Sequence, residues 1–298
     1  MSVDDKVQLR YEDREGGGVA FVTLNREAKL NALDSDLMEQ FANVFEQLAH
    51  RELLRCVVVT GAGDRAFAAG ADVEELASIM FPTEAGGFIN RVHACCEAVR
   101  SISVPVIARI NGHALGAGLE LAISCDLRVA ADAATFGMPE VRLGIPSVVE
   151  AALLPGLIGW GRAREMLLLG DSYDAHTALE MGLVEEVVPA DTLNAAVERR
   201  IASVMANGRN ALRLQKALLR RWETMPIRDA ILAGVDVFGQ AFQTDEPGIA
   251  MRAWSTTSAI KPRPPKPPAP PARAKTSRAA SGKKPTAKKA TARRAGEG

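Results

Sequence analysis

The sequence contains few of the residues that build metal or disulfide sites. Its 298 residues include four cysteines and four histidines, and no two cysteines have Cys-x-x-Cys spacing. The cysteines lie in apolar or helical surroundings, so we expect reduced thiols in the core rather than a disulfide framework. The histidines are scattered without partner spacing, which argues against a zinc site. A cysteine nucleophile is equally unexpected, because none of the four cysteines sits beside a histidine in an apparent turn. The four cysteines are Cys56, Cys95, Cys96 and Cys125.

Long apolar stretches are also missing. No uninterrupted apolar run reaches the length of a membrane span, and the first ten residues, MSVDDKVQLR, lack the apolar core of a secretory signal. We therefore expect a cytoplasmic protein with no membrane segment. The Gly-Ala-Gly runs at residues 61–63 and 116–118 do not continue into Gly-Lys-Ser/Thr, so neither is a phosphate-binding P-loop.

A formal net charge of zero hides a strong asymmetry along the chain. Residues 261–298 carry twelve Lys or Arg and one acid, which leaves 24 basic and 35 acidic residues in 1–260. The same segment holds eight of the sixteen prolines and no aromatic residue. Such a composition cannot bury a core, so we predict a disordered basic tail. Two alternatives remain open for this tail: it binds polyanions weakly and without specificity, or it is solvated and has no partner.

The rest of the chain has the patterns of an α/β fold. Its hydrophobic content of 47% is enough for one large core. Apolar, β-branched runs at residues 19–25, 55–63 and 104–112 predict strands, and helical spacing at 31–50 and 72–80 predicts helices between them. Strands that alternate with helices in this way favour parallel pairing in a buried sheet.

The periodicity changes near Thr192 and stays mostly helical to Phe242. We therefore divide the chain into three parts. Residues 1–191 form the predicted core, residues 192–260 a helical subdomain where protomers meet, and residues 261–298 the tail.

Two turns rich in glycine and alanine stand where a predicted strand passes into a predicted helix. They lie in FAAGADVEEL (67–76) and HALGAGLELAISCD (113–126). The first amides of a helix have no intrahelical acceptor and point outward, toward negative charge. Two such turns can aim one N–H each at one developing oxyanion. The alternative is that each is only a tight connection.

Two acidic residues accompany these turns. Glu120 follows the second turn, and Glu140 lies twenty residues further on, in ATFGMPEVRLGIP. Apolar neighbours of Glu140 would suit a general acid or base that works near neutral pH. Alone, Glu140 would be a solvated loop acid, but beside Glu120 it becomes a candidate proton carrier.

Several ordered motifs resemble the enoyl-CoA hydratase/isomerase (crotonase) family across roughly residues 10–255. They are NREAKLNAL, FAAGADVEEL, VPVIARINGHALGAGLELAISCDLRVAADAATFGMPE and GDSYDAHTALEMGLVEEVVP. The resemblance implies a spiral of repeated β-β-α units with a C-terminal helical subdomain. It also implies an acyl-CoA substrate, no metal or other cofactor, and a homotrimer or dimer of trimers.

The resemblance assigns roles to individual positions. It places two oxyanion-hole amides at Ala71 and Ala117, which polarise a thioester carbonyl. It makes Glu120 and Glu140 the catalytic acids, which hold a water between them. The residues that it assigns to coenzyme A binding are Lys29, Leu30, Ala69, Ala71, Asp72, Val73, Glu74 and Ala117. For Arg26, phosphate contact and solvated surface charge are both open.

One segment departs from the family pattern. Residues 145–159 read IPSVVEAALLPGLIG where many family hydratases have a glycine-rich stretch. Ser147 and Glu150 therefore predict a larger, more polar wall of the acyl pocket. Glu150 is either a third acid in the site or, more simply, an outward or salt-bridged residue. We expect His113 to be packed rather than catalytic.

Three functions are consistent with these features. The first is an enoyl-CoA hydratase that adds water to a trans-2-enoyl-CoA, which uses both glutamates. The second is an enoyl-CoA isomerase or another enolate-forming enzyme, and the altered segment after Ile145 leaves it open. The third is a binding protein that uses its basic tail on nucleic acid or an acidic partner.

Overall fold

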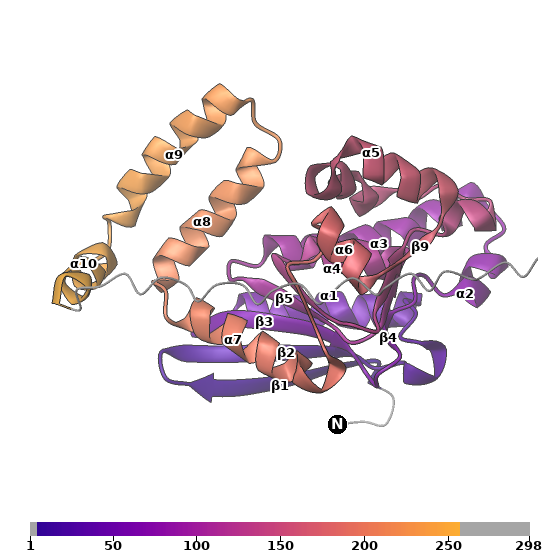
Figure 1. The fold of residues 1–298 in the computed structure, drawn as a ribbon, viewed down its shortest axis with the longest axis horizontal. Coiled ribbons are helices and arrows are strands. Elements are labelled where there is room, and N and C mark those ends of the chain that lie inside the picture. Colours follow the sequence, from indigo (N-terminus) through magenta and orange to yellow (C-terminus); the bar gives the residue numbers. More distant parts are fainter. Residues whose placement is uncertain (1–4, 257–298) are drawn as a thin grey trace, which may run out of the picture. The chain divides into compact units, whose positions relative to one another are not determined.

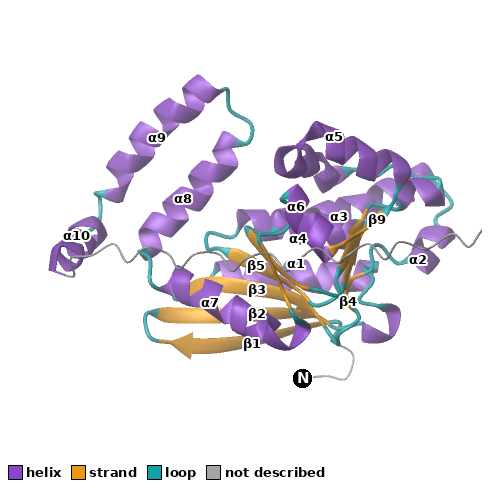
Figure 2. Cartoon of the chain, viewed as in Figure 1, coloured by secondary structure: helices purple, strands orange, loops and turns teal. Residues whose placement is uncertain are grey.

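The computed structural model describes residues 5–256, which form a mixed α/β fold with two sheets (Figures 1 and 2). The larger sheet has six strands in the order β1-β2-β3-β5-β7-β10. They are β1 (Val7–Arg14), β2 (Gly17–Leu24), β3 (Leu54–Gly61), β5 (Val106–Ile110), β7 (Leu127–Ala131) and β10 (Glu186–Val188). The smaller sheet, in the order β4-β6-β8-β9, has β4 (Ala66–Ala68), β6 (His113–Leu115), β8 (Thr135–Gly137) and β9 (Ser172–Asp174).

Ten α-helices and four short 3₁₀ helices lie within the described residues. The α-helices are α1 (Ser35–Ala49), α2 (Val73–Ser78), α3 (Pro82–Ser101), α4 (Ala117–Ser124), α5 (Leu154–Leu169), α6 (Ala175–Met181), α7 (Leu193–Met205), α8 (Arg209–Trp222), α9 (Ile227–Ala241) and α10 (Glu246–Thr256). The 3₁₀ helices are η1 (Glu27–Lys29), η2 (Glu140–Leu143), η3 (Val149–Leu153) and η4 (Ala190–Thr192).

Parallel pairing in the large sheet confirms the prediction from its apolar runs. Strands β2, β3, β5, β7 and β10 pair in parallel, and only β1 adds an antiparallel edge among the described strands of this sheet. Alternate residues of β3 pack into opposite layers: Val57 and Val59 join the core under α1 and α3, while Cys56 and Val58 join the core under α7. A strand covered on both faces needs an unbroken apolar sequence.

The first long helix shows how sequence pattern sets packing. The side chain of Asp34 caps α1 by accepting a hydrogen bond of 2.8 Å from the amide of Leu37. Phe41, Phe45 and Leu48 continue from Leu37 along the same face, and all four are buried. That stripe packs α1 against α3 and the sheet.

The small sheet decides where the glycine-rich turns lie. β4 and β8 both pair with β6 in parallel, so the carboxyl ends of all three strands meet at one edge. Each strand leads at that edge into a helix: β4 into α2, β6 into α4 and β8 into η2. Three connections that are far apart in sequence are therefore neighbours.

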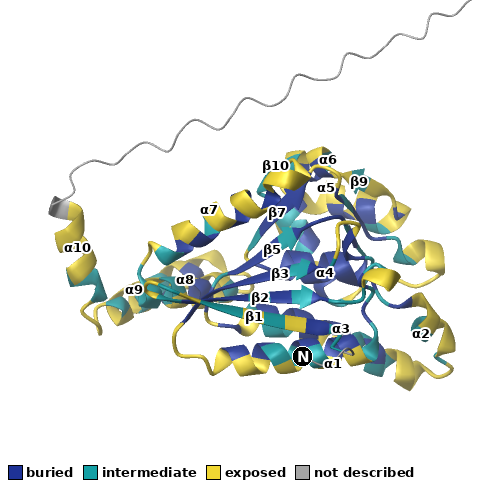
Figure 3. Cartoon of the chain, turned by 90° about the horizontal axis from the view of Figure 1, so that it is seen from below, coloured by how far each residue is buried: buried dark blue, intermediate teal, exposed yellow. Residues whose placement is uncertain are grey.

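The C-terminal part is helical, as predicted, but its helices differ in burial. Helix α8 is fastened to the body by Lys216, which is buried and donates 2.7 Å to Asp126 and 3.0 Å to the carbonyl of Val104. Figure 3 shows α10 mostly exposed, and α9 leaves a row of large apolar side chains uncovered. That row comprises Ile227, Ile231, Val235, Phe238 and Phe242.

Two further expectations can be compared with the described residues. All four cysteines are free and buried, which confirms their place in the core. No helix within residues 5–256 is long and apolar enough to cross a membrane. The predicted tail, residues 261–298, lies outside the part of the chain that the structure describes.

Candidate active site

A cavity of about 330 Å³ opens at the edge of the small sheet where the three connections meet. The turns before α2 and α4 form one wall, and the side chains of Glu120, Glu140 and Ser147 supply its polar atoms. The remaining walls are apolar. They include Leu76, Ile79, Phe88, Ile89, Val92 and Leu143. A mostly apolar pocket with a few convergent polar groups is the usual form of a small-molecule site.

The turn before α2 presents the amide of Ala71. Its neighbours are used elsewhere: the carbonyl of Gly70 accepts from Leu33 at 2.8 Å, and the amide of Asp72 donates to Leu33 at 2.9 Å. This short parallel bridge leaves the Ala71 amide outside the ladder. Gly70 has a φ of +110°, which favours glycine, and a Cβ there would lie 4.0 Å from the amide nitrogen of Ala117. The two turns are thus in close contact.

The turn before α4 presents the amide of Ala117. Gly116 precedes the helix with a φ of +50°, and its amide donates to the carbonyl of Gly137 at 2.9 Å. Ala117 is the first helical residue, so its amide has no acceptor within the helix. Among the hydrogen bonds of residues 5–256, neither the Ala71 amide nor the Ala117 amide has an acceptor. Both residues line the cavity as available donors.

Glu120 is the buried acid of the site. It lies on the first turn of α4 and is only 3% exposed. Its Oε1 accepts a hydrogen bond of 3.0 Å from the amide of Ala151 in η3. The pKa of Glu120 is raised to about 8, mainly because the carboxyl group is buried. The hydrogen bond from Ala151 lowers this pKa, and the nearby carboxylates of Glu140 and Glu150 raise it further.

Glu140 reaches the same cavity from η2 and is half-buried. Its Oε2 accepts a hydrogen bond of 2.7 Å from the hydroxyl of Ser147. A Cβ on Gly116 would collide with Oε1 of Glu140, while the carbonyl of Gly116 accepts from the Glu120 amide at 3.0 Å. The two acids therefore meet around Gly116. The apolar neighbours of Glu140 in sequence predicted desolvation of its carboxyl group, but Glu140 is only half-buried and Glu120 is the more buried acid.

The predicted coenzyme A residues gather around the first turn. Lys29 forms an exposed ion pair of 2.5 Å with Glu74, and the carbonyl of Leu30 accepts from the Ala69 amide at 3.0 Å. Asp72 caps α2 through the amide of Glu74, at 3.0 Å. The fold thus brings residues 29–30 beside residues 69–74. Val73 is exposed at the start of α2.

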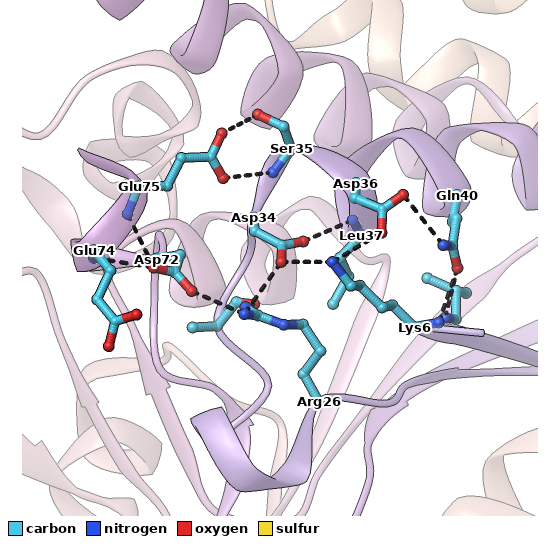
Figure 4. A network of polar contacts seen from close by, with 12 residues as sticks. Lys6, Arg26, Asp34, Ser35, Asp36, Leu37, Gln40, Asp72, Glu74 and Glu75 are labelled. Carbon is cyan, nitrogen blue, oxygen red and sulfur yellow. Dashed lines mark hydrogen bonds and ion pairs between the residues drawn. The ribbon is translucent and has the colours of Figure 1, made fainter. Parts of the chain in front are cut away.

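Arg26 is held inside an ion-pair network rather than presented to solvent (Figure 4). Its guanidinium lies 3.1 Å from Asp34 and 2.9 Å from Asp72, and Lys6 is paired with Asp34 at 2.8 Å. The side chain is 15% exposed, so the interpretation as solvated surface charge is wrong. Arg26 ties the N-terminal cap of α1 to that of α2 and so holds the first turn in place.

The simpler interpretation of Glu150 was an outward or salt-bridged residue, and the structure excludes the outward alternative. It is 6% exposed, and its Oε1 lies 2.7 Å from Nδ1 of His93 on α3. The contact has the geometry of the salt bridge that was one of the alternatives, and it is an ion pair when the imidazole is protonated; no sequence spacing indicated His93 as the partner. His113 is packed as expected, with its Nδ1 2.6 Å from the hydroxyl of Thr135.

Sequence reasoning also missed what Ser147 does. It identified Ser147 as part of a larger pocket wall, whereas the structure makes its hydroxyl the partner of Glu140. Within residues 5–256, no group of three or more His, Cys, Asp or Glu side chains is placed to hold a metal ion.

Comparisons with known proteins identify the family of the chain. The family model described as enoyl-CoA hydratase/isomerase matches residues 14–257. The chain belongs to the enoyl-CoA hydratase/isomerase family. The resemblance inferred from its motifs, and the crotonase fold that the resemblance implied, are confirmed.

Individual members of the family match over most of their length. A short-chain-enoyl-CoA hydratase from Clostridium acetobutylicum is 36% identical over 241 residues, which cover 80% of this chain and 91% of the relative. A crotonyl-CoA hydratase from Syntrophomonas wolfei is 34% identical, over 79% and 91% of the two chains. The crystal structure of an enoyl-CoA hydratase from Bacillus anthracis superposes with a TM-score of 0.80 at 32% identity, covering 85% of this chain and 96% of that one.

Proposed function

We propose that this family member is an enoyl-CoA hydratase, which adds water across the C2=C3 bond of a trans-2-enoyl-CoA. The proposal rests on one observation. A single apolar cavity is lined by two carboxyl groups, one more buried than the other, and by two backbone amides that have no acceptor among the described residues. The names of the similar proteins, short-chain-enoyl-CoA hydratase and crotonyl-CoA hydratase, support the same reaction.

The amides of Ala71 and Ala117 bind the thioester oxygen. As water adds to C3, negative charge moves onto that oxygen and the two donors stabilise it. Each donor of this kind contributes about 3–4 kcal/mol to the stability of a transition state. The donors are backbone groups, so alanine at either position serves as well as glycine.

Glu120 and Glu140 divide the proton transfers. With a pKa of about 8, Glu120 is mostly protonated at neutral pH in the free protein. A pair that holds one proton can act as base and acid in one turnover. One carboxyl group takes a proton from the attacking water, and the other supplies a proton to C2.

The remaining features of the proposal follow from family membership and from the charges around the first turn. Coenzyme A is part of the substrate, and we propose that residues 29–30 and 69–74 contact it and that no other cofactor is needed.

The test follows the absorbance of the conjugated thioester of crotonyl-CoA and of longer enoyl-CoA esters. We expect Glu120→Gln and Glu140→Gln each to lower kcat by roughly 10²–10⁴-fold, the contribution of a positioned acid or base. Glu46 is an exposed acid on α1, so Glu46→Gln is the matched control and should have the kcat of the wild type. Full activity in both site variants would reject the mechanism. Conversion of a 3-enoyl-CoA to the 2-enoyl product without hydration would favour an isomerase.

We also propose that the C-terminal helices assemble the protein into a homotrimer or a dimer of trimers. The supporting observation is the uncovered apolar row of α9, because soluble monomers seldom expose large contiguous apolar patches. Light scattering on the full chain should give a mass three or six times that of the monomer. Replacement of Val235 and Phe238 by Lys should lower that mass, and an unchanged mass would place the interface elsewhere.

The basic tail carries a separate, weaker proposal, namely non-specific binding of polyanions. Twelve basic side chains in residues 261–298 support it through counterion release. Full-length protein should elute from a polyanion column at higher salt than a chain ending at residue 260. Identical elution would end the proposal.

A further inference from the structure

The cavity has more apolar space than the reacting atoms need. Its volume is about 330 Å³, and its polar side chains are those of Glu120, Glu140 and Ser147. Helices α2 and α3 and the residues that follow Glu140 line the rest of it with apolar side chains. Addition of water needs room for the thioester, the C2=C3 bond and one water molecule. Most of the apolar walls therefore have no part in the reaction itself.

The volume of the cavity can be expressed in carbon atoms. An apolar protein cavity of about 150 Å³ holds one benzene molecule, that is, six carbons. By the same measure, a cavity of about 330 Å³ takes roughly thirteen atoms of this size. The thioester, C2, C3 and the attacking water account for about half of them, and the remainder corresponds to an acyl chain of about eight to ten carbons. A crotonyl group would leave most of this space unfilled.

Unfilled apolar space makes a short substrate bind less tightly than the cavity allows. A buried water molecule needs about two to four polar partners, and the side chains of Leu76, Ile79, Phe88 and Val92 offer none. A longer acyl chain would instead contact these walls. Each CH₂ group that is removed from water improves binding by up to about fourfold. The cavity therefore favours a chain that fills it.

Gly86 lies in the wall of this space. It is an interior residue of α3, which begins at Pro82, and glycine is less favourable inside a helix than any residue except proline. Its φ is not positive, and no atom of the described residues lies within 4 Å of the position that a Cβ would take. Neither backbone conformation nor packing therefore requires glycine here. A side chain at this position would fill part of the cavity.

The rim of the cavity is apolar as well. Ala85, the residue before Gly86, lines the cavity and is exposed, so the space reaches the surface beside the start of α3. Leu143, Ile145 and Val148 also line the cavity and are exposed. An acyl chain that is longer than the enclosed space can continue along these side chains, and it would cover them from water.

We propose that the substrate is a medium-chain 2-enoyl-CoA of about eight to ten carbons, and that Gly86 is a specificity-determining residue because it leaves room for the chain beside α3. This inference rests on the proposed hydratase function. The chain extends from C3, near Glu120 and Glu140, along the apolar walls and past Gly86 toward the rim.

The first test measures kcat/KM of the full chain for trans-2-enoyl-CoA esters of four to twelve carbons. The value should rise about twofold to fourfold for each added CH₂ group up to about eight to ten carbons, and then level off. A maximum at crotonyl-CoA, or the same value at every length, would overturn the inference.

A second test changes Gly86. The side chain of Gly86→Leu would replace about four carbons of the acyl chain, so kcat/KM for 2-decenoyl-CoA should fall roughly 100-fold. The value for crotonyl-CoA should stay within about twofold of the wild type, because its chain ends before Gly86. Gly86→Ala adds one carbon and should lower the decenoyl value by about fourfold.

Gly87→Leu is the matched control. Gly87 also lies in α3 with open space around its missing Cβ, but it is not part of the lining of the cavity. This variant should keep the wild-type dependence on chain length. Leucine is more favourable than glycine in a helix, so thermal unfolding should show no loss of stability in either variant. Equal losses with both esters in Gly86→Leu, or no loss with 2-decenoyl-CoA, would overturn the role of Gly86.

Binding of saturated esters separates this inference from the proposed function. Octanoyl-CoA and butanoyl-CoA have no C2=C3 bond to hydrate, so their Kd values do not depend on catalysis. By calorimetry, octanoyl-CoA should bind the wild type roughly 100-fold more tightly than butanoyl-CoA, and Gly86→Leu should lose this difference. If the hydratase proposal fails, no enoyl ester is hydrated but the difference in Kd remains. If the inference on chain length fails, crotonyl-CoA is hydrated at least as well as longer esters and the two saturated esters bind equally.

Discussion

The two halves of the cavity wall are built on different principles. The half at Ala71 and Ala117 uses main-chain amides whose direction is set by strand ends and by the positive φ of Gly70 and Gly116. The other half uses carboxyl groups, each held by a contact from another segment. The amide half should therefore depend on backbone conformation and tolerate side-chain changes, whereas the acid half should depend on each side chain and its partner.

The strongest expected effect concerns the acid half and pH. The folded-state pKa of Glu120, about 8, lies above the ordinary value of 4.5, so the folded protein binds this proton more tightly than the unfolded chain. The resulting stability is fully present below pH 4.5 and is lost as pH rises toward 8. The loss should be up to about 5 kcal/mol, at about 1.4 kcal/mol per pH unit.

Urea unfolding of the wild type and of Glu120→Gln across this pH range measures that loss. As pH rises from 4.5 to 8, the unfolding free energy of the wild type should fall relative to that of Glu120→Gln. A difference that is constant between pH 4.5 and 8 would mean that Glu120 is not desolvated as described. Glu46→Gln again serves as the exposed control.

Gly116→Ala should have the next largest effect, because it affects both halves at once. The residue has a φ of +50°, and the new Cβ would collide with Oε1 of Glu140. Displacing the second amide donor and one acid should lower kcat by roughly 10²–10³-fold, as loss of an oxyanion donor does. Steady-state hydration of crotonyl-CoA measures it. Wild-type kcat in this variant would show that neither group is used as proposed.

Ser147→Ala should have a moderate effect confined to the acid half. It removes the 2.7 Å hydrogen bond to Glu140 and leaves the amide half untouched. The net value of one such bond is about 0.5–1.5 kcal/mol, which corresponds to a fall in kcat of roughly 2–10-fold. A Ser147→Thr variant keeps a hydroxyl and should retain more activity than alanine. Equal loss in both would point to crowding instead.

Ala117→Ser should have the smallest effect and completes the comparison. It keeps the amide and adds one polar atom at a position that is buried but borders the cavity. We expect kcat within about twofold of the wild type, because the donor belongs to the backbone. A loss as large as that of Gly116→Ala would mean that the side chain, not the amide, matters here.

Much of the amide half could be predicted from local sequence. Glycines that follow short apolar strands and precede a helix indicate a turn with outward amides, and the resemblance to the family assigned the two donors to Ala71 and Ala117. These features depend on neighbours within a few residues. The strands at residues 19–25, 55–63 and 104–112, the helices between them and their parallel pairing followed from equally local patterns.

The partners of the acids could not be predicted in this way. Glu150 and His93 are 57 positions apart, and only the packing of η3 against α3 brings them together. Arg26 and Asp72 are 46 positions apart and meet because two helix caps face each other. Polar contacts of this range have no periodic signal in the sequence.

The sequence by itself determined the apolar runs of the sheet, the two glycine-rich turns and the family to which the chain belongs. Only the tertiary structure decided that Glu120 is the desolvated acid, that Ser147 holds Glu140 and that Glu150 is enclosed beside His93. The physical reason is that secondary structure depends on the backbone and on near neighbours. The proton affinity of a carboxyl group depends instead on every charge and surface that distant segments pack around it.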